Sequence, residues 1–253
     1  MQQKVPSVGT PDTERGLRRD LDSLAAAMSS IAAHFVPSSS YELSPLASLG
    51  IATGSQQDLF RQTFTMRGSD KATTHSYHEA YPIILSHISP IARVLEIGIG
   101  ARQPSPDNQS GWPGEAGGSL HAWSAITNGA EVLGLDIDPR MDEVSPSIRT
   151  MSLDSLNHES LQSVSQAILR EKKLYDLVVD DGLHVPEAQV NNMLHFFSTV
   201  RPHGFYVVED VHESIAVALC EVARMLGSRH VFEYGRKSGD YGDDNGLIAV
   251  QRP

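Results

Sequence analysis

The sequence predicts an α/β protein built on a doubly wound, mainly parallel sheet of seven strands. From residue 92 onward, short apolar runs alternate with segments of helical periodicity, which is typical of parallel strands with helices on both faces. The last two apolar runs, 231–236 and 246–252, have only a turn-rich stretch between them and predict an antiparallel hairpin. With 253 residues, 40% of them hydrophobic, the chain can bury the core of one large domain.

The N-terminal part predicts a helical extension. Thr10 and Pro11 form a typical helix start. An apolar stripe at helical spacing follows, at Leu17, Leu21, Leu24, Met28 and Ile31. This helix either packs on its own domain or contacts a second subunit, and both alternatives remain open. Residues 37–56 are rich in Ser, Pro and Gly, which favours a linker. We therefore assign residues 1–60 to an N-terminal helical extension and linker, and residues 61–253 to the main domain.

The main domain can be followed element by element. Before the hairpin, apolar runs predict strands at 92–97, 131–136, 149–154, 175–181 and 205–211. Helices are predicted at 118–128, 157–171, 187–199 and 213–226. Residues 101–118 form a long loop directly after the first of these strands. Because open α/β sheets bind ligands at the carboxyl ends of their strands, we expect this loop to have a functional role at the ligand site.

The composition excludes several classes of partner. Against 20 basic residues stand 31 acidic ones, a net charge of −11, so a nucleic acid is not expected as a partner. No apolar run approaches the roughly 18 residues of a membrane-spanning helix, and the first residues lack the apolar core of a secretory signal. The single cysteine, Cys220, excludes an intrachain disulfide framework. We therefore expect a cytoplasmic protein that acts without a membrane.

Acidic residues stand at the ends of five predicted strands. They are Glu96, Asp136, Asp154, the pair Asp180 and Asp181, and the pair Glu209 and Asp210. The carboxyl ends of parallel strands line the ligand crevice of a doubly wound sheet, so these acids are placed for function. The alternative for each one is that it caps the helix that follows.

A glycine turn with Gly98 and Gly100 follows the first of these strands. A dinucleotide fingerprint would need a further glycine at position 103, which is Gln103, so that interpretation is weak. Glu96 beside the turn would oppose a pyrophosphate, whereas Asp136 suits ribose hydroxyls. The combination favours a nucleoside ligand without a diphosphate.

Several motifs resemble those of known enzymes. VLEIGIG followed by GLDID resembles the first two motifs of class I S-adenosylmethionine-dependent methyltransferases, which have a Rossmann-like fold. Four further segments narrow the resemblance: SDKATTHSYHEAY (69–81), GGSLHAW (117–123), VVDDGLHVPEAQ (178–189) and YVVEDV (206–211). Over roughly residues 65–212, the chain resembles the metal-dependent sugar O-methyltransferases of antibiotic biosynthesis, which include the mycinamicin and tylosin-type macrolide enzymes. It departs from them at Leu183, where the family often has serine.

The resemblance implies S-adenosyl-L-methionine as the cofactor. Glu96, Gly98 and Gly100 would line its methionine part, and Asp136 would bind the ribose. The remaining cofactor residues would be Ser119 near the carboxylate, Asp154 at the adenine edge and Asp180 closing the pocket.

The catalytic residues follow from the chemistry and from the resemblance. A sugar hydroxyl is a very weak acid, and a divalent cation can lower its pKa and hold it in place. Asp181, Glu209 and Asp210 offer oxygen ligands that suit Mg²⁺. The alternative is a set of capping acids without a metal. His184 matches the histidine that is the proposed general base in the resembling family. The alternative is that His184 is an exposed loop residue.

Two residues of the segment 69–81 remain without an assigned role. His75 and Tyr77 resemble a family motif near the cofactor, and simple packing is the alternative.

The expected reaction is Mg²⁺-assisted O-methylation of a sugar hydroxyl, on a deoxysugar such as rhamnose. This sugar is either linked to TDP or part of a natural-product glycoside. The alternatives are a catechol-type O-methyltransferase and a non-catalytic binding module, and a homo-oligomer is expected. With 6% aromatic residues, no clamp for a flat substrate is evident.

Overall fold

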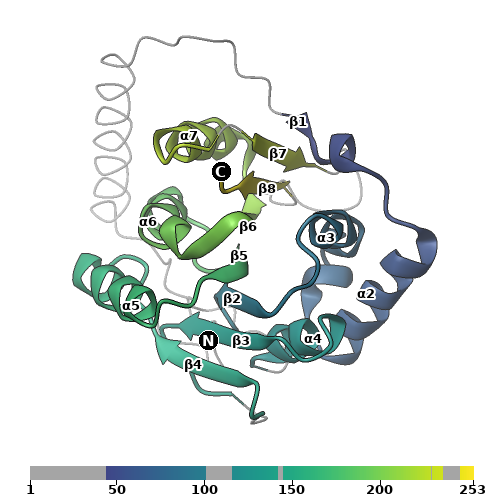
Figure 1. Cartoon of the computed structure of the whole chain (residues 1–253), viewed down its shortest axis with the longest axis horizontal. Helices are drawn as coiled ribbons and strands as arrows, with labels where there is room; N and C mark the ends of the chain where they lie inside the picture. Colours follow the sequence, from purple (N-terminus) through teal and green to yellow (C-terminus); the bar gives the residue numbers. More distant parts are fainter. Residues whose placement is uncertain (1–43, 101–115, 142–144, 229, 236–245) are drawn as a thin grey trace, which may run out of the picture. The chain divides into compact units, whose positions relative to one another are not determined.

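A computed structural model of the chain forms an eight-stranded sheet flanked by helices (Figure 1). It describes residues 44–100, 116–141, 145–228, 230–235 and 246–253. The apolar stripe from Leu17 to Ile31 and almost all of the loop 101–118 lie outside the described residues. Everything described belongs to one compact unit, Leu43–Pro253.

The strand order is β1-β7-β8-β6-β5-β2-β3-β4. All neighbouring pairs are parallel except those of β8, which runs antiparallel to both β6 and β7. The doubly wound sheet and its antiparallel hairpin are therefore confirmed. The strands are β1 (Ser44–Pro45), β2 (Arg93–Ile97), β3 (Glu131–Asp136), β4 (Ile148–Ser152), β5 (Tyr175–Asp180), β6 (Val200–Val211), β7 (His230–Tyr234) and β8 (Gly246–Gln251).

Helices cover both faces of the sheet. Figure 1 shows α5, α6 and α7 on one face and α2, α3 and α4 on the other. The longer helices are α2 (Gly54–Met66), α3 (Tyr77–Ser86), α4 (Gly118–Ile126), α5 (His158–Arg170), α6 (Pro186–Phe196) and α7 (Glu213–Met225). The short 3-10 helices are η1 (Leu46–Leu49), η2 (Asp70–Ala72) and η3 (Phe197–Thr199). None of the helices in the described part of the chain is long and apolar enough to cross a membrane.

The segment before β2 is more structured than its composition indicates. Residues 44–49, expected within a linker, form β1 and η1, and β1 extends the sheet beside β7. Helix α2 begins at a capping box, in which Thr53 and Gln56 bond each other's backbone N–H groups. The predicted domain division at residue 60 falls inside this helix.

The core beneath the carboxyl edge of the sheet is aromatic. Trp123 of α4 meets Tyr81 of α3 edge-on at a ring-centroid distance of 4.7 Å, and Phe64 of α2 at 5.0 Å. All three side chains are buried. This packing fixes α3 and α4 against the ends of β2 and β6, where the predicted acids lie.

Candidate active site and metal centre

Four carboxylates gather at the carboxyl edge of the sheet. Glu96 lies in β2, Asp181 directly follows β5, and Glu209 and Asp210 lie in β6. Strand β5 pairs with both β2 and β6, so these strand ends are adjacent, as the sequence predicted. Glu96, Glu209 and Asp210 are buried. Such a concentration of negative charge requires cationic partners.

Lys71 supplies one of these partners. Its Nζ lies 3.1 Å from Oε1 of Glu96 and 2.5 Å from Oε2 of Glu209, and it also forms an ion pair with Oδ2 of Asp181. Burial alone would lower the pKa of Lys71, but Asp181, Glu209 and Glu96 raise that pKa well above its ordinary value. Lys71 is therefore a buried ammonium. Sequence reasoning missed it, although it stands in the segment 69–81 that carried part of the resemblance.

Asp181, His184 and Asp210 form a potential metal-binding group. One ligand atom from each lies within 4.8 Å of the others. The Nε2 atom of His184 is 3.5 Å from Oδ1 of Asp181 and 3.2 Å from Oδ2 of Asp210. Two carboxylates that converge on one point offer the hard oxygen donors that suit Mg²⁺.

Glu209 is held by partners outside this group. Its Oε2 is bound by Lys71, and its Oε1 accepts a hydrogen bond from the hydroxyl of Tyr81. Burial, reinforced by Asp181 and opposed by Lys71, raises the pKa of Glu209. Of the three predicted metal ligands, the structure thus brings two together with His184. The role of Glu209 as a ligand stays a prediction.

His75 and Tyr77 lie at Asp210. The hydroxyl of Tyr77 donates to Oδ1 of Asp210, and the ring of His75 stacks on that of Tyr77 at 5.0 Å with an interplanar angle of 4°. The Nδ1 atom of His75 is 3.4 Å from Oδ1 of Asp210. Burial and the Asp210 carboxylate raise the pKa of Tyr77, which keeps the phenol neutral and able to donate. The segment therefore holds one acid of the potential metal group.

The charges of the group act on one another. Burial would lower the pKa of His184, but Asp181 and Asp210 outweigh this effect and raise the pKa to about 9. Burial would likewise raise the pKa of Asp181, yet Lys71 and His184 hold it below its ordinary value. In this arrangement, His184 is an imidazolium at neutral pH. Neutralising the carboxylates would return the pKa of His184 toward its ordinary value.

The glycine turn lies against Asp181, the residue that follows β5. Gly98 and Gly100 have φ values of 84° and 78°, in the left-handed region that favours glycine. The N–H of Gly98 donates to the carbonyl oxygen of Leu135 at 2.7 Å. A Cβ atom at Gly98 would lie 1.9 Å from the carbonyl oxygen of Asp181, so no larger residue fits.

Asp136 and Asp154 both bond to nearby backbone. The carboxylate of Asp136 accepts from the N–H groups of Ile99 and Asp138, each at 2.9 Å. Each of its oxygens retains a second lone pair, which fits a role toward ribose hydroxyls. Asp154 accepts from the N–H of Leu156 at 3.0 Å and so stabilises the turn before α5. The cofactor roles of both residues stay predictions.

Glu96 and Ser119 bind each other. The Oε2 atom of Glu96 accepts from the hydroxyl of Ser119 at 2.8 Å and from Nε1 of Trp123 at 3.1 Å. Burial raises the pKa of Glu96, although Lys71 opposes the shift. Glu96 thus joins the first turn of α4 to the buried ammonium. Its contact with a cofactor stays a prediction.

Asp180 is held inside the sheet rather than in the acidic group. Its carboxylate accepts from Nδ2 of Asn192 at 3.0 Å and from the hydroxyl of Tyr206 at 3.3 Å. Burial raises the pKa of Asp180 to about 7, although these hydrogen bonds oppose the shift. Its predicted part in closing the cofactor pocket stays untested.

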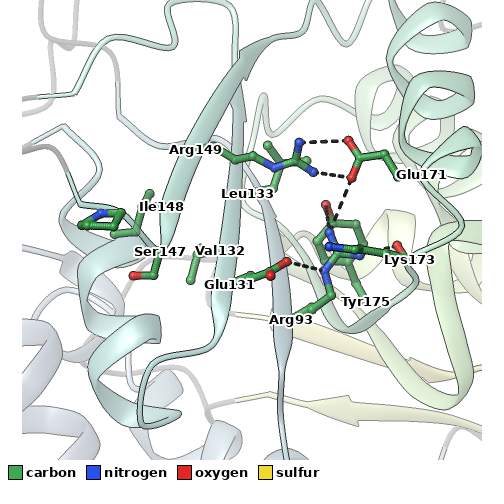
Figure 2. A pocket seen from close by; sticks show the side chains of 11 residues that line it. Arg93, Glu131, Val132, Leu133, Ser147, Ile148, Arg149, Glu171, Lys173 and Tyr175 are labelled. Carbon is green, nitrogen blue, oxygen red and sulfur yellow. Dashed lines mark hydrogen bonds and ion pairs between the residues drawn. The ribbon is translucent and has the colours of Figure 1, made fainter.

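A separate pocket of about 290 Å³ opens at the opposite edge of the sheet. Figure 2 shows side chains from the first residues of β2, β3 and β5, including Arg93, Glu131 and Tyr175. Arg149 bonds Glu171 there at 2.9 and 2.7 Å, and Arg93 bonds Glu131 at 3.1 Å. These ion pairs tie the amino ends of the strands together, away from the acids.

The chain is similar to curated enzymes of antibiotic biosynthesis. It is 32% identical over 151 residues to 8-demethyl-8-alpha-L-rhamnosyl tetracenomycin-C 2'-O-methyltransferase of Streptomyces olivaceus, a match that covers 58% of this chain and 36% of that one. It is 33% identical over 119 residues to mycinamicin VI 2''-O-methyltransferase of Micromonospora griseorubida, a match that covers 47% of this chain and 27% of that one. The chain thus spans about a third of the length of the curated relatives it matches. No protein-family model matches.

Solved structures agree with the fold. The MycE methyltransferase from the mycinamycin pathway, in complex with Mg, SAH and mycinamycin VI, has a TM-score of 0.54 and 21% identity, covering 82% of this chain and 55% of that one. A second MycE crystal, with Mg and SAH, gives a TM-score of 0.55. The resemblance seen in the sequence motifs is therefore confirmed. The chain has the class I methyltransferase fold, and its curated relatives are sugar O-methyltransferases of antibiotic biosynthesis.

Proposed function

We propose that this protein transfers a methyl group from S-adenosyl-L-methionine to a sugar hydroxyl in antibiotic biosynthesis, with the help of Mg²⁺. The observation that carries the proposal is the convergence of Asp181, Asp210 and His184 at adjacent strand ends, beside the glycine turn of Gly98. The tetracenomycin and mycinamicin relatives support a deoxysugar as the substrate class. TDP-rhamnose and a rhamnosyl glycoside are both candidates.

Each residue of the site receives a role. Mg²⁺, when bound, would acidify and hold vicinal hydroxyls of the sugar. Asp181 and Asp210, with Glu209, would hold the cation. The cation would neutralise the two carboxylates that raise the pKa of His184, 3.2 Å from Asp210, and the neutral imidazole would then accept the hydroxyl proton. The cofactor would be held by Glu96, Gly98, Gly100, Ser119, Asp136, Asp154 and Asp180.

The substrate assay tests this proposal directly. The purified chain would be incubated with S-adenosyl-L-methionine, Mg²⁺ and one acceptor at a time: TDP-rhamnose, a rhamnosyl glycoside or a catechol. Mass spectrometry should detect a methylated sugar with one of the first two acceptors. Methylation of the catechol alone would overturn the sugar assignment.

We propose further that the chain forms a homo-oligomer through the helix predicted from the apolar stripe between Leu17 and Ile31. Its apolar residues recur at helical spacing, which favours packing of one face of the helix against a partner. Light scattering on a variant lacking residues 1–36 should show a smaller species. An oligomer of unchanged size would mean that the extension plays no part in assembly.

A further inference from the structure

Lys71 lies almost fully inside the protein, with 1% of its side chain exposed. Its ammonium contacts Glu96, Asp181 and Glu209, which come from three different strand ends. An ammonium has three N–H donors, so each donor can serve one carboxylate. Two of these donors bind Asp181 and Glu209, and Glu96 lies at ion-pair distance from the same ammonium.

These contacts occupy oxygens that a metal ion would use. Asp181 gives Oδ2 to Lys71 and turns Oδ1 toward His184. Glu209 gives Oε2 to Lys71 and Oε1 to Tyr81, so both of its oxygens are already bound. A metal ion bound by Glu209 would therefore share one of its oxygens with Lys71 or with Tyr81.

We infer that Lys71 is a fixed internal cation that competes with the metal ion for Asp181 and Glu209 and thereby sets the metal affinity. This inference rests on the proposed function, since it concerns the same metal site. Two effects act in the same direction. The ammonium repels a second cation held by the same acids, and it relieves the repulsion among these acids before any metal binds.

Glu96 holds the ammonium from the other side. Of the three carboxylates that form ion pairs with Lys71 in the described part of the chain, Glu96 is the one that is not a predicted metal ligand, and it is itself held by Ser119 and Trp123. Removing its charge would leave the ammonium to Asp181 and Glu209 alone. The competition with the metal would then become stronger.

Calorimetry with Mg²⁺ alone, without cofactor or substrate, tests the inference on the full chain. Lys71→Met should bind Mg²⁺ about ten-fold more tightly or better, while its melting temperature without metal falls. Lys71→Arg keeps the charge and should stay within about three-fold of the parent chain. Glu96→Gln should bind Mg²⁺ about three-fold more weakly or worse. A merely structural role would not make a destabilised variant bind metal more tightly.

The control is Lys173→Met, which makes the same change of charge at the exposed opposite edge and should leave the Mg²⁺ affinity unchanged. A folded Lys71→Met that binds Mg²⁺ no better than the parent chain would overturn the inference. If that variant does not fold, Glu96→Gln decides, and an affinity equal to or above that of the parent is the contrary result. A parent chain that binds no Mg²⁺ would refute the proposed metal site itself and the inference with it.

Discussion

Tyr77 and Asp210 bond each other twice across 133 positions of sequence: the Tyr77 hydroxyl donates to the Asp210 carboxylate and accepts from the Asp210 backbone N–H at 3.0 Å. Asp210 has a φ of 52°, a left-handed conformation that a non-glycine residue adopts only at some cost. The double contact stabilises this conformation. It also aims the second carboxylate oxygen at His184.

Removing the Tyr77 hydroxyl should therefore disturb the metal site. We expect Tyr77→Phe to bind Mg²⁺ about ten-fold more weakly and to lose about 1–3 kcal/mol of stability, because a buried carboxylate and a backbone donor lose their partner. Calorimetry and urea unfolding would measure the two effects. Tyr234→Phe is the control, since its hydroxyl bonds Ser76 and Glu79 instead. Unaltered metal affinity in Tyr77→Phe would show that Asp210 needs no such support.

Metal removal should stop the reaction. A strong chelator should abolish methyl transfer, and added Mg²⁺ should restore it. Asp210→Asn and Asp181→Asn should abolish turnover because the amides keep the shape but lose the charge that binds a cation. Affinity for S-adenosylhomocysteine, measured by calorimetry, should change little in both variants. The proposed metal requirement is falsified if the chelated protein keeps full activity on its true substrate.

The proposed base can be tested separately from binding. His184→Ala should lower kcat about 10²–10⁴-fold, the usual contribution of a positioned base, and leave cofactor affinity nearly unchanged. His158→Ala, at the exposed start of α5, should behave like the parent chain. Turnover close to normal in His184→Ala would assign the proton to another group.

Asp136 tests the cofactor assignment. Asp136→Ala should weaken binding of S-adenosylhomocysteine about ten-fold or more, since the ribose loses a charged acceptor and the turn at Ile99 loses a hydrogen bond. Glu131→Ala, at the exposed opposite end of the same strand, serves as the control. Equal affinities in the two variants, measured by calorimetry, would mean that β3 does not reach the cofactor.

Asp180 should make stability depend on pH. Burial raises its pKa from 3.8 to about 7, so between these values the folded chain holds a proton that the unfolded chain releases. The free energy of unfolding therefore decreases as pH rises through this window. Asp180→Asn removes the titrating group. Relative to the parent chain, this variant should gain on the order of 3 kcal/mol between about pH 4 and pH 7.

Urea unfolding of both proteins at the two pH values, in the presence of a chelator, checks this expectation. The chelator keeps metal binding at the neighbouring Asp181 from adding its own pH dependence. A stability difference that is the same at both pH values would mean that Asp180 is ionised in the folded protein.

The strands could be predicted because their pattern is local. β5 is buried along all of its residues, and its central residues 177–179 form an apolar run that ends in acids. Helix α3 was not predicted, because it is buried on nearly every side and contains Pro82, so no apolar stripe marks it. Its residues are selected by contacts with the sheet and with α4, which the local sequence does not encode.

The site shows the same division. The acids could be predicted from their places at strand ends, since parallel strands bring these ends together. Lys71 could not, because a buried lysine is stabilised only by partners at positions 96, 181 and 209, far along the chain. The direction of Glu209 depends on Lys71 and Tyr81 and was hidden for the same reason.

Redesign of this protein meets a constraint at Gly98. Since a Cβ there would lie 1.9 Å from the Asp181 carbonyl oxygen, the turn proposed to hold the cofactor packs directly against the strand end proposed to hold the metal. A mutant library that enlarges this turn would therefore displace Asp181 as well. Substitutions are better introduced at Leu183, because its side chain is 49% exposed.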